Sequence, residues 1–268
     1  MPAQYSDGLR LDYLQYTVRS DRQMFETTIR ILEPDRPEQV ERPRIVYVLP
    51  SCPELSHRSG DGLDQILTYD LHNRYGLVAV APTFSDWPWM TDVPDQQTLR
   101  QVLYFLEDVV GFVDGLYPGL PRLLIGYSKG GSAALQLLLR YPDLFRAAAA
   151  FDSPIMKEQP DQWEMPYFWP NAHHFQHFAI PNLLRTRGKL LGDSPRIALF
   201  GYGNFGKNAP DWTYDHLGAG HTLMNELGIP HFYSNDTRRE HRWDSGWLPD
   251  AVDALAHMST RPSGTLPP

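Results

Sequence analysis

The chain has 268 residues, of which 42% are hydrophobic and 21% are charged, values typical of a folded globular protein rather than a disordered one. Its 24 basic and 32 acidic residues give a net charge of −8, which argues against a nucleic-acid-binding surface. The single cysteine, Cys52, excludes an intrachain disulfide framework and a cysteine-rich zinc site.

The N-terminal residues show no basic segment followed by an apolar one, which is the pattern of a secretory signal. The apolar runs of the chain are also too short to cross a bilayer. We therefore expect a cytoplasmic protein without a membrane span.

In chain order, alternating segments at 14–18 and 25–31 predict an antiparallel hairpin at a sheet edge. Near-continuous apolar runs follow, as expected of strands buried on both faces, and a last strand is expected at 229–234. These runs are 44–49, 77–81, 123–125, 147–151 and 196–200. Helical patterns lie between and after them, at 62–74, 98–116, 130–141, 216–227 and 248–258. The alternation predicts a single domain of the α/β class, with a mostly parallel central sheet and helices on both faces.

One segment, 154–195, breaks this alternation, because it has no strand signal and is rich in aromatic residues. Since it lies between two predicted core strands, we interpret it as a cap-like insertion over one end of the sheet. The tail, 259–268, is rich in Ser, Thr, Pro and Gly, and we expect it to be flexible.

The motif with the clearest chemical meaning is Gly126-Tyr127-Ser128-Lys129-Gly130, a G-x-S-x-G pattern between a buried strand and a helix that begins with small residues. This context predicts a sharp strand-to-helix turn with a strained backbone at Ser128, and glycines on either side leave room for it. The turn would present Ser128 Oγ at the carboxyl end of the sheet as a nucleophile, beside the N-terminus of the helix.

With these features the chain resembles the α/β-hydrolase superfamily, in particular its branch of small putative esterases, from about residue 44 to the closing helix. The resemblance implies a Ser–acid–His triad in that chain order, with no cofactor and no metal. It does not imply a particular substrate, because the fold supports many hydrolytic reactions.

The resemblance places the histidine in the loop after the last strand, where His241 is followed by tryptophans. His241 would accept the proton of Ser128 and return it to the leaving group. The other histidines of the C-terminal region lie inside predicted strands or helices: His216, His221, His231 and His257.

The sequence leaves two main candidates for the acidic residue of the triad. Family members commonly place it after the strand 196–200, but this chain has Asn204 there, and Asp211 is the first acid that follows. A minority of the superfamily places the acid one strand earlier, where Asp152 ends an Ala-rich buried strand. An aspartate there needs a partner, and a histidine that must be oriented would provide one, although a turn role is the alternative. Asp152 is preferred over Asp211, and Asp215 is the third candidate.

The oxyanion hole requires two N–H donors. The first is expected to be the backbone N–H of Lys129, and the second that of Cys52 in the loop after strand 44–49, with Ser51 as the alternative. Pro50 and Pro53 of that loop cannot donate.

Three aromatic residues are candidates for a substrate pocket: Trp87, Trp89 and Tyr127. The two tryptophans follow the carboxyl end of a predicted strand, but packing of the cap explains them equally well. His173 and His177 have the spacing of metal ligands on a helix, yet no carboxylate lies at ligand spacing, so a polar surface is the preferred interpretation. The G-x-G-x-x-G spacing at 201–206 is rejected as a dinucleotide site because no helix follows it.

The predicted function is that of a serine hydrolase that cleaves a small-molecule carboxylic ester through an acyl-enzyme. A peptidase of the same fold is the first alternative, suggested by the doubled glycine at Gly130 and Gly131. A binding protein that kept the fold without catalysis is the second. The oligomeric state is not predicted.

Overall fold

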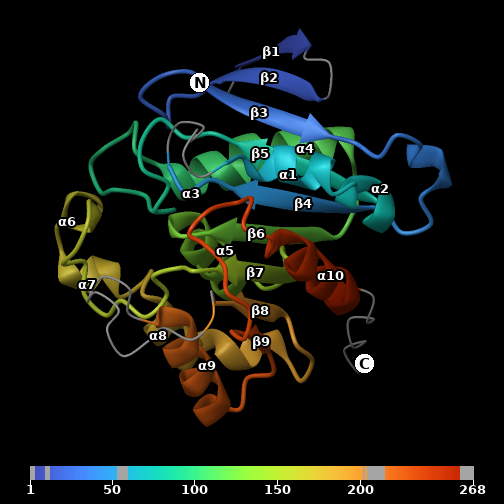
Figure 1. Cartoon of the computed structure of the whole chain (residues 1–268). Helices are drawn as coiled ribbons and strands as arrows, with labels where there is room; N and C mark the ends of the chain where they lie inside the picture. The colour runs from blue at the N-terminus through green and yellow to red at the C-terminus, as the bar shows by residue number, and fades with distance from the viewer. Residues whose placement is uncertain (1–3, 10–12, 53–59, 202, 204–214, 260–268) are drawn as a thin grey trace, which may run out of the picture.

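The computed structural model describes residues 4–9, 13–52, 60–201, 203 and 215–259 (Figure 1). Its centre is a sheet of nine strands in the order β1-β2-β3-β5-β4-β6-β7-β8-β9. The strands are β1 (Gln4–Leu9), β2 (Leu14–Arg19), β3 (Thr27–Leu32), β4 (Arg44–Leu49), β5 (Leu77–Pro82), β6 (Arg122–Tyr127), β7 (Ala147–Phe151), β8 (Ile197–Phe200) and β9 (Phe232–Ser234). Strands β1 to β3 pair antiparallel, and β3 also pairs antiparallel with β5. The run from β5 to β9 is parallel throughout, as predicted.

The parallel strands are apolar on both faces because two layers of helices cover them. Along β4, Tyr47 packs into one apolar layer and its neighbours Val46 and Val48 pack into the other. Helices α1 (Gly62–Thr68), α2 (Leu71–Tyr75) and α10 (Leu248–Ser259) lie on the second face, in front of the sheet in Figure 1. Helices α4 (Gly111–Leu116), α5 (Lys129–Arg140), α8 (Ile180–Arg187) and α9 (His216–Leu227) cover the first. The α/β-hydrolase arrangement expected from the sequence is thus confirmed.

Four local predictions differ from the structure. The helix expected at 62–74 is two helices, because Asp70 adopts a left-handed conformation (φ 54°) between them. The last strand is shorter than expected and covers only Phe232–Ser234. The predicted hairpin is not the sheet edge, since β1 pairs outside it. An edge strand is half-solvated and needs little apolar sequence, so the polar stretch 4–9 gave no strand signal.

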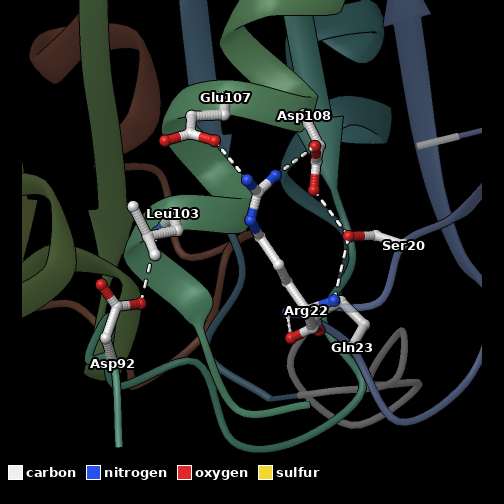
Figure 2. A network of polar contacts seen from close by, with 7 residues as sticks. All are labelled: Ser20, Arg22, Gln23, Asp92, Leu103, Glu107 and Asp108. Carbon is white, nitrogen blue, oxygen red and sulfur yellow. Dashed lines mark hydrogen bonds and ion pairs between the residues drawn. The ribbon is translucent and has the colours of Figure 1, made fainter. Parts of the chain in front are cut away.

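The helix expected at 98–116 is also divided, into α3 (Gln101–Leu103), a π-helical turn, η2 (Tyr104–Val110), and α4. The π-helical turn presents Asp108, which is 5% exposed, to the turn between β2 and β3. There Ser20 Oγ donates to one oxygen of Asp108 (2.6 Å), and Arg22 pairs with the other (2.6 Å) and with Glu107 (Figure 2). This network fastens the N-terminal hairpin to the helical layer.

The segment 154–195 contains α6 (Met165–Phe168), α7 (Ala172–Phe175), α8 and a 3₁₀ turn, η3 (Gly188–Leu191), and contributes no strand to the sheet. Its large aromatic residues are buried in the same apolar layer as α5: Phe168, Trp169, Phe175 and Phe178. The segment is therefore packed onto the core. Among the described helices, none combines the length and the hydropathy needed to cross a membrane.

Candidate active site

Ser128 occupies the turn between β6 and α5 with φ 53° and ψ −130°, a backbone conformation that non-glycine residues seldom adopt. The glycines on either side are required by close backbone approach. A Cβ on Gly126 would lie 2.3 Å from the carbonyl carbon of Gly130, and one on Gly130 would lie 2.3 Å from Leu49 O. The sequence motif therefore folds into the sharp turn that it predicts, with the half-buried Ser128 at its tip.

Asp152 follows β7, the strand next to β6, and it too has a positive φ of 40°. The two turns are joined, because Ser128 N–H donates to Phe151 O (3.0 Å). One oxygen of Asp152 contacts Nδ1 of His241 in a short hydrogen-bonded ion-pair geometry. The structure thus brings together Asp152 and His241, which lie 89 residues apart in the chain.

The His241 ring also reaches the nucleophile turn, since it packs edge-on against Tyr127 with the ring centroids 5.0 Å apart. Tyr127 directly precedes Ser128, so the contacts close a circuit from the Ser128 turn to Asp152, to His241 and back. In Figure 1 the loop between β9 and α10, which carries His241, runs back along the sheet as far as β6.

Two tryptophans hold this histidine loop through contacts that the sequence did not predict. Trp243 packs edge-on against Tyr127 (5.2 Å) and stacks on Trp247 (5.2 Å), which in turn stacks on Phe151 (4.8 Å). Both tryptophans are buried, and Trp247 Nε1 donates to Arg242 O (3.0 Å). The aromatic stack joins the loop to the ends of the strands that bear Ser128 and Asp152.

The expected oxyanion donors lie at adjoining backbone segments. Lys129 begins α5, and the first N–H groups of a helix have no acceptor within it. The exit of β4 lies directly against this helix start, as the close approach of Leu49 O to Gly130 shows. Cys52 comes three residues after Leu49, is half-buried, and lines a small cavity of about 30 Å³ together with Trp243.

The Lys129 side chain makes contacts that sequence reasoning missed. Its ammonium lies 4.3 Å from the ring centroid of Trp87, 5.1 Å from that of Trp89, and 3.4 Å from an oxygen of Glu164 in the cap-like segment. Trp89 is 2% exposed, stacking on Trp163 (6.1 Å) and contacting Trp169 edge-on (5.9 Å). For Trp89 this geometry favours the packing role, while Trp87 is half-buried beside the ammonium. Tyr127 is likewise buried and supports the histidine loop.

The remaining candidates lie elsewhere. Asp211 and Asn204 fall outside the described residues. Asp215 caps α9, since its carboxylate accepts from Gly218 N–H (2.7 Å). The rings of His173 and His177 are 5.7 Å apart near α7, and within the described part of the chain no group of three or more His, Cys, Asp or Glu residues could hold a metal ion.

Comparison with known proteins gives one family match and several similar solved structures. Residues 85–182, a little over a third of the chain, match the model of a family described as putative esterase, and this range includes Ser128 and Asp152. No curated protein matches the sequence. Among solved structures, an S-formylglutathione hydrolase from Agrobacterium tumefaciens is similar, with a TM-score of 0.68 and 13% identity over 96% of this chain and 99% of that one. A fluorophosphonate-binding serine hydrolase from Staphylococcus aureus gives 0.68 and 13% over 97% and 100%, and a ferulic acid esterase gives 0.67 and 15% over 96% and 98%.

At these identities the solved structures show the fold alone, and the family match covers the segment that contains the Ser128 turn. The prediction of an esterase-like enzyme is confirmed at the level of that family match. The chain has the α/β-hydrolase fold and, through residues 85–182, the sequence features of the putative esterase family.

Proposed function

We propose that this protein is a serine hydrolase of carboxylic esters, with Ser128 as nucleophile, His241 as general base and acid, and Asp152 as the residue that orients His241. The observation that carries the proposal is the circuit of contacts joining the strained Ser128 turn, Asp152 and His241. Strained backbones at two neighbouring strand ends cost about 1–3 kcal/mol each and are common at catalytic sites.

In the proposed reaction, His241 Nδ1–H donates to Asp152, which leaves Nε2 unprotonated and able to accept the Ser128 hydroxyl proton. Ser128 Oγ attacks the ester carbonyl, and the oxyanion is bound by the N–H groups of Lys129 and Cys52. The tetrahedral intermediate collapses to an acyl-serine as His241 protonates the departing alcohol. Water, deprotonated by His241, then attacks the acyl-serine and releases the carboxylic acid.

The comparisons support an ester as the substrate class. The matching family is described as putative esterase, and similar folds include a ferulic acid esterase and an S-formylglutathione hydrolase. The substrate we propose is accordingly a small-molecule ester, and the steps above require no cofactor.

A fluorophosphonate probe tests the nucleophile, because it reacts with a serine that has an adjacent base and an oxyanion hole. The wild-type protein should be labelled at Ser128 and should hydrolyse p-nitrophenyl esters, and Ser128→Ala should lose both properties while remaining folded. Ser132→Ala is the matched control, since Ser132 lies one turn along the same helix and is 2% exposed. Labelling that persists in Ser128→Ala would refute the assignment.

A further inference from the structure

A second cavity lies at the opposite end of α5 from Ser128. Ser128 directly precedes α5, and Arg140 is the twelfth and last residue of that helix, so the two are about 18 Å apart along its axis. The cavity is an open groove of about 770 Å³ between the end of α5, the cap-like segment and the loop before α3. Its lining includes Arg100, Arg140, His174 and Arg187.

Arg140 is a largely buried cation with no charged partner in contact. Its guanidinium lies over the ring of Phe178, 4.4 Å from the centroid, and within the described residues no carboxylate forms an ion pair with it. Nη1 is buried and makes no hydrogen bond to any described residue. Burial lowers the pKa of Arg140, which reflects the cost of keeping this charge away from water.

Two neighbours in the groove repeat this pattern. Arg100 Nε and His174 Nδ1 are also buried without a hydrogen-bond partner in the described part of the chain. Burial is the main cause that lowers the pKa of His174, and the neighbouring His177 and Arg140 lower it further. The three donors, Arg140 Nη1, Arg100 Nε and His174 Nδ1, therefore line one cavity and have no hydrogen-bond acceptor among the described residues.

The negative charge of Asp92 partly offsets the effect of burial on the pKa values of Arg140 and His174, but no hydrogen bond joins it to the three donors within the described residues. Asp92 Oδ1 is held by the backbone N–H groups of Val102 (2.9 Å) and Leu103 (3.2 Å), the latter drawn in Figure 2. Asp95 is exposed on the loop. Arg187, in contrast, is occupied, since it donates to Leu139 O (2.8 Å) and Arg140 O (3.1 Å) at the end of α5.

We propose that this groove is a binding site for a small molecule with an oxyanion group, a phosphate or a carboxylate, which is bound by Arg140, Arg100 and His174. Guanidinium groups pair with both anions in a two-pronged geometry, and an imidazole adds a third donor. The volume suits a small organic ligand, and Phe178 and Tyr141 offer it apolar contact. The site is separate from the ester-cleaving centre and does not depend on the proposed reaction.

The test is an NMR titration of the His174 imidazole, assigned by loss of its resonance in His174→Gln. Inorganic phosphate or succinate is added against sodium chloride of equal ionic strength. An anion bound beside His174 should raise its pKa and saturate with concentration, because the neighbouring negative charge favours the imidazolium. Saturation with phosphate or with succinate identifies which oxyanion the groove takes.

Arg140→Met and Arg100→Met should each weaken the binding at least tenfold. Arg185→Met is the matched control, because Arg185 is an exposed arginine of α8 that pairs with Glu158 outside the groove. The proposal is overturned if neither anion shifts the pKa of His174 beyond the chloride control, or if Arg140→Met and Arg100→Met bind as the wild type does. Should either variant fail to fold, the wild-type titration still decides.

Discussion

Ser128 and Asp152 show at the scale of single residues how the fold uses backbone strain. Both have positive φ angles, and each turn follows one of two neighbouring parallel strands. The Ser128 N–H bond to Phe151 O links the turns, so their side chains lie at the same edge of the sheet. The sequence left the acid open between Asp152 and Asp211, and the contact with His241 favours Asp152.

We therefore expect Asp152→Asn to lower kcat for a p-nitrophenyl ester by about 10⁴-fold, because an amide stabilises the wrong tautomer of His241. Asp211→Asn should retain most of the activity. Steady-state kinetics on both variants, with thermal unfolding to check folding, make the comparison. Near-wild-type turnover in Asp152→Asn together with a collapse in Asp211→Asn would assign the acid to Asp211 instead.

At the scale of elements, α5 connects features that the sequence presents separately. Its first residue, Lys129, supplies a backbone donor to the proposed oxyanion hole and a side chain that contacts Trp87 and Glu164. Glu164 belongs to the cap-like segment, and its Oε2 is the atom that lies 3.4 Å from the Lys129 ammonium. The ion pair thus tethers the cap-like segment beside the Ser128 turn.

Loss of this tether should affect substrate binding more than chemistry. In Glu164→Gln the carboxylate charge is removed, and a partly exposed ion pair of this kind contributes about 1 kcal/mol. We expect KM for long-chain p-nitrophenyl esters to rise about fivefold, with a smaller change in kcat. Glu158→Gln, which alters an exposed carboxylate of the same segment, is the control. Equal kinetics for the two variants would show that the Lys129–Glu164 pair has no part in binding.

At the scale of the whole molecule, we expect buried histidines to make stability depend on pH. His216, at the start of α9, accepts a hydrogen bond from Met156 N–H (3.1 Å) through Nδ1, and so joins α9 to the segment after β7. Burial, with a smaller effect of Lys157, lowers the pKa of His216 from 6.5 to about 4. Burial also lowers the pKa values of His174 and His231.

His216 is expected to stay neutral in the folded protein down to about pH 4, so between pH 4 and 6.5 the unfolded chain binds more protons at this position. The contribution of His216 is fully present above pH 6.5 and is lost as the pH falls towards 4, by at most about 3 kcal/mol. Urea unfolding across this range should show the free energy of unfolding rising with pH. His216→Asn, which keeps an acceptor for Met156 N–H, should flatten the slope, and an unchanged slope would contradict this assignment.

The sequence by itself determined the fold class and the sharp turn at Ser128, because both depend on short-range patterns. Apolar runs alternating with helical periods require a covered parallel sheet. A serine between Gly126 and Gly130 after a buried strand requires a sharp turn, since only glycine permits the close approaches found there. His241, in contrast, was chosen as the candidate base because the family resemblance places a histidine after the last strand.

Only the tertiary structure decided which groups meet. The contact between Asp152 and His241, the Lys129 contacts with Trp87 and Glu164, and the groove around Arg140 all join segments that are distant in sequence. The π-helical turn is a further example, because its Asp108 pairs with Arg22, which lies 86 residues earlier in the chain. Local periodicity reports which face of an element is buried, whereas such pairings depend on how loops and helices pack over the finished sheet.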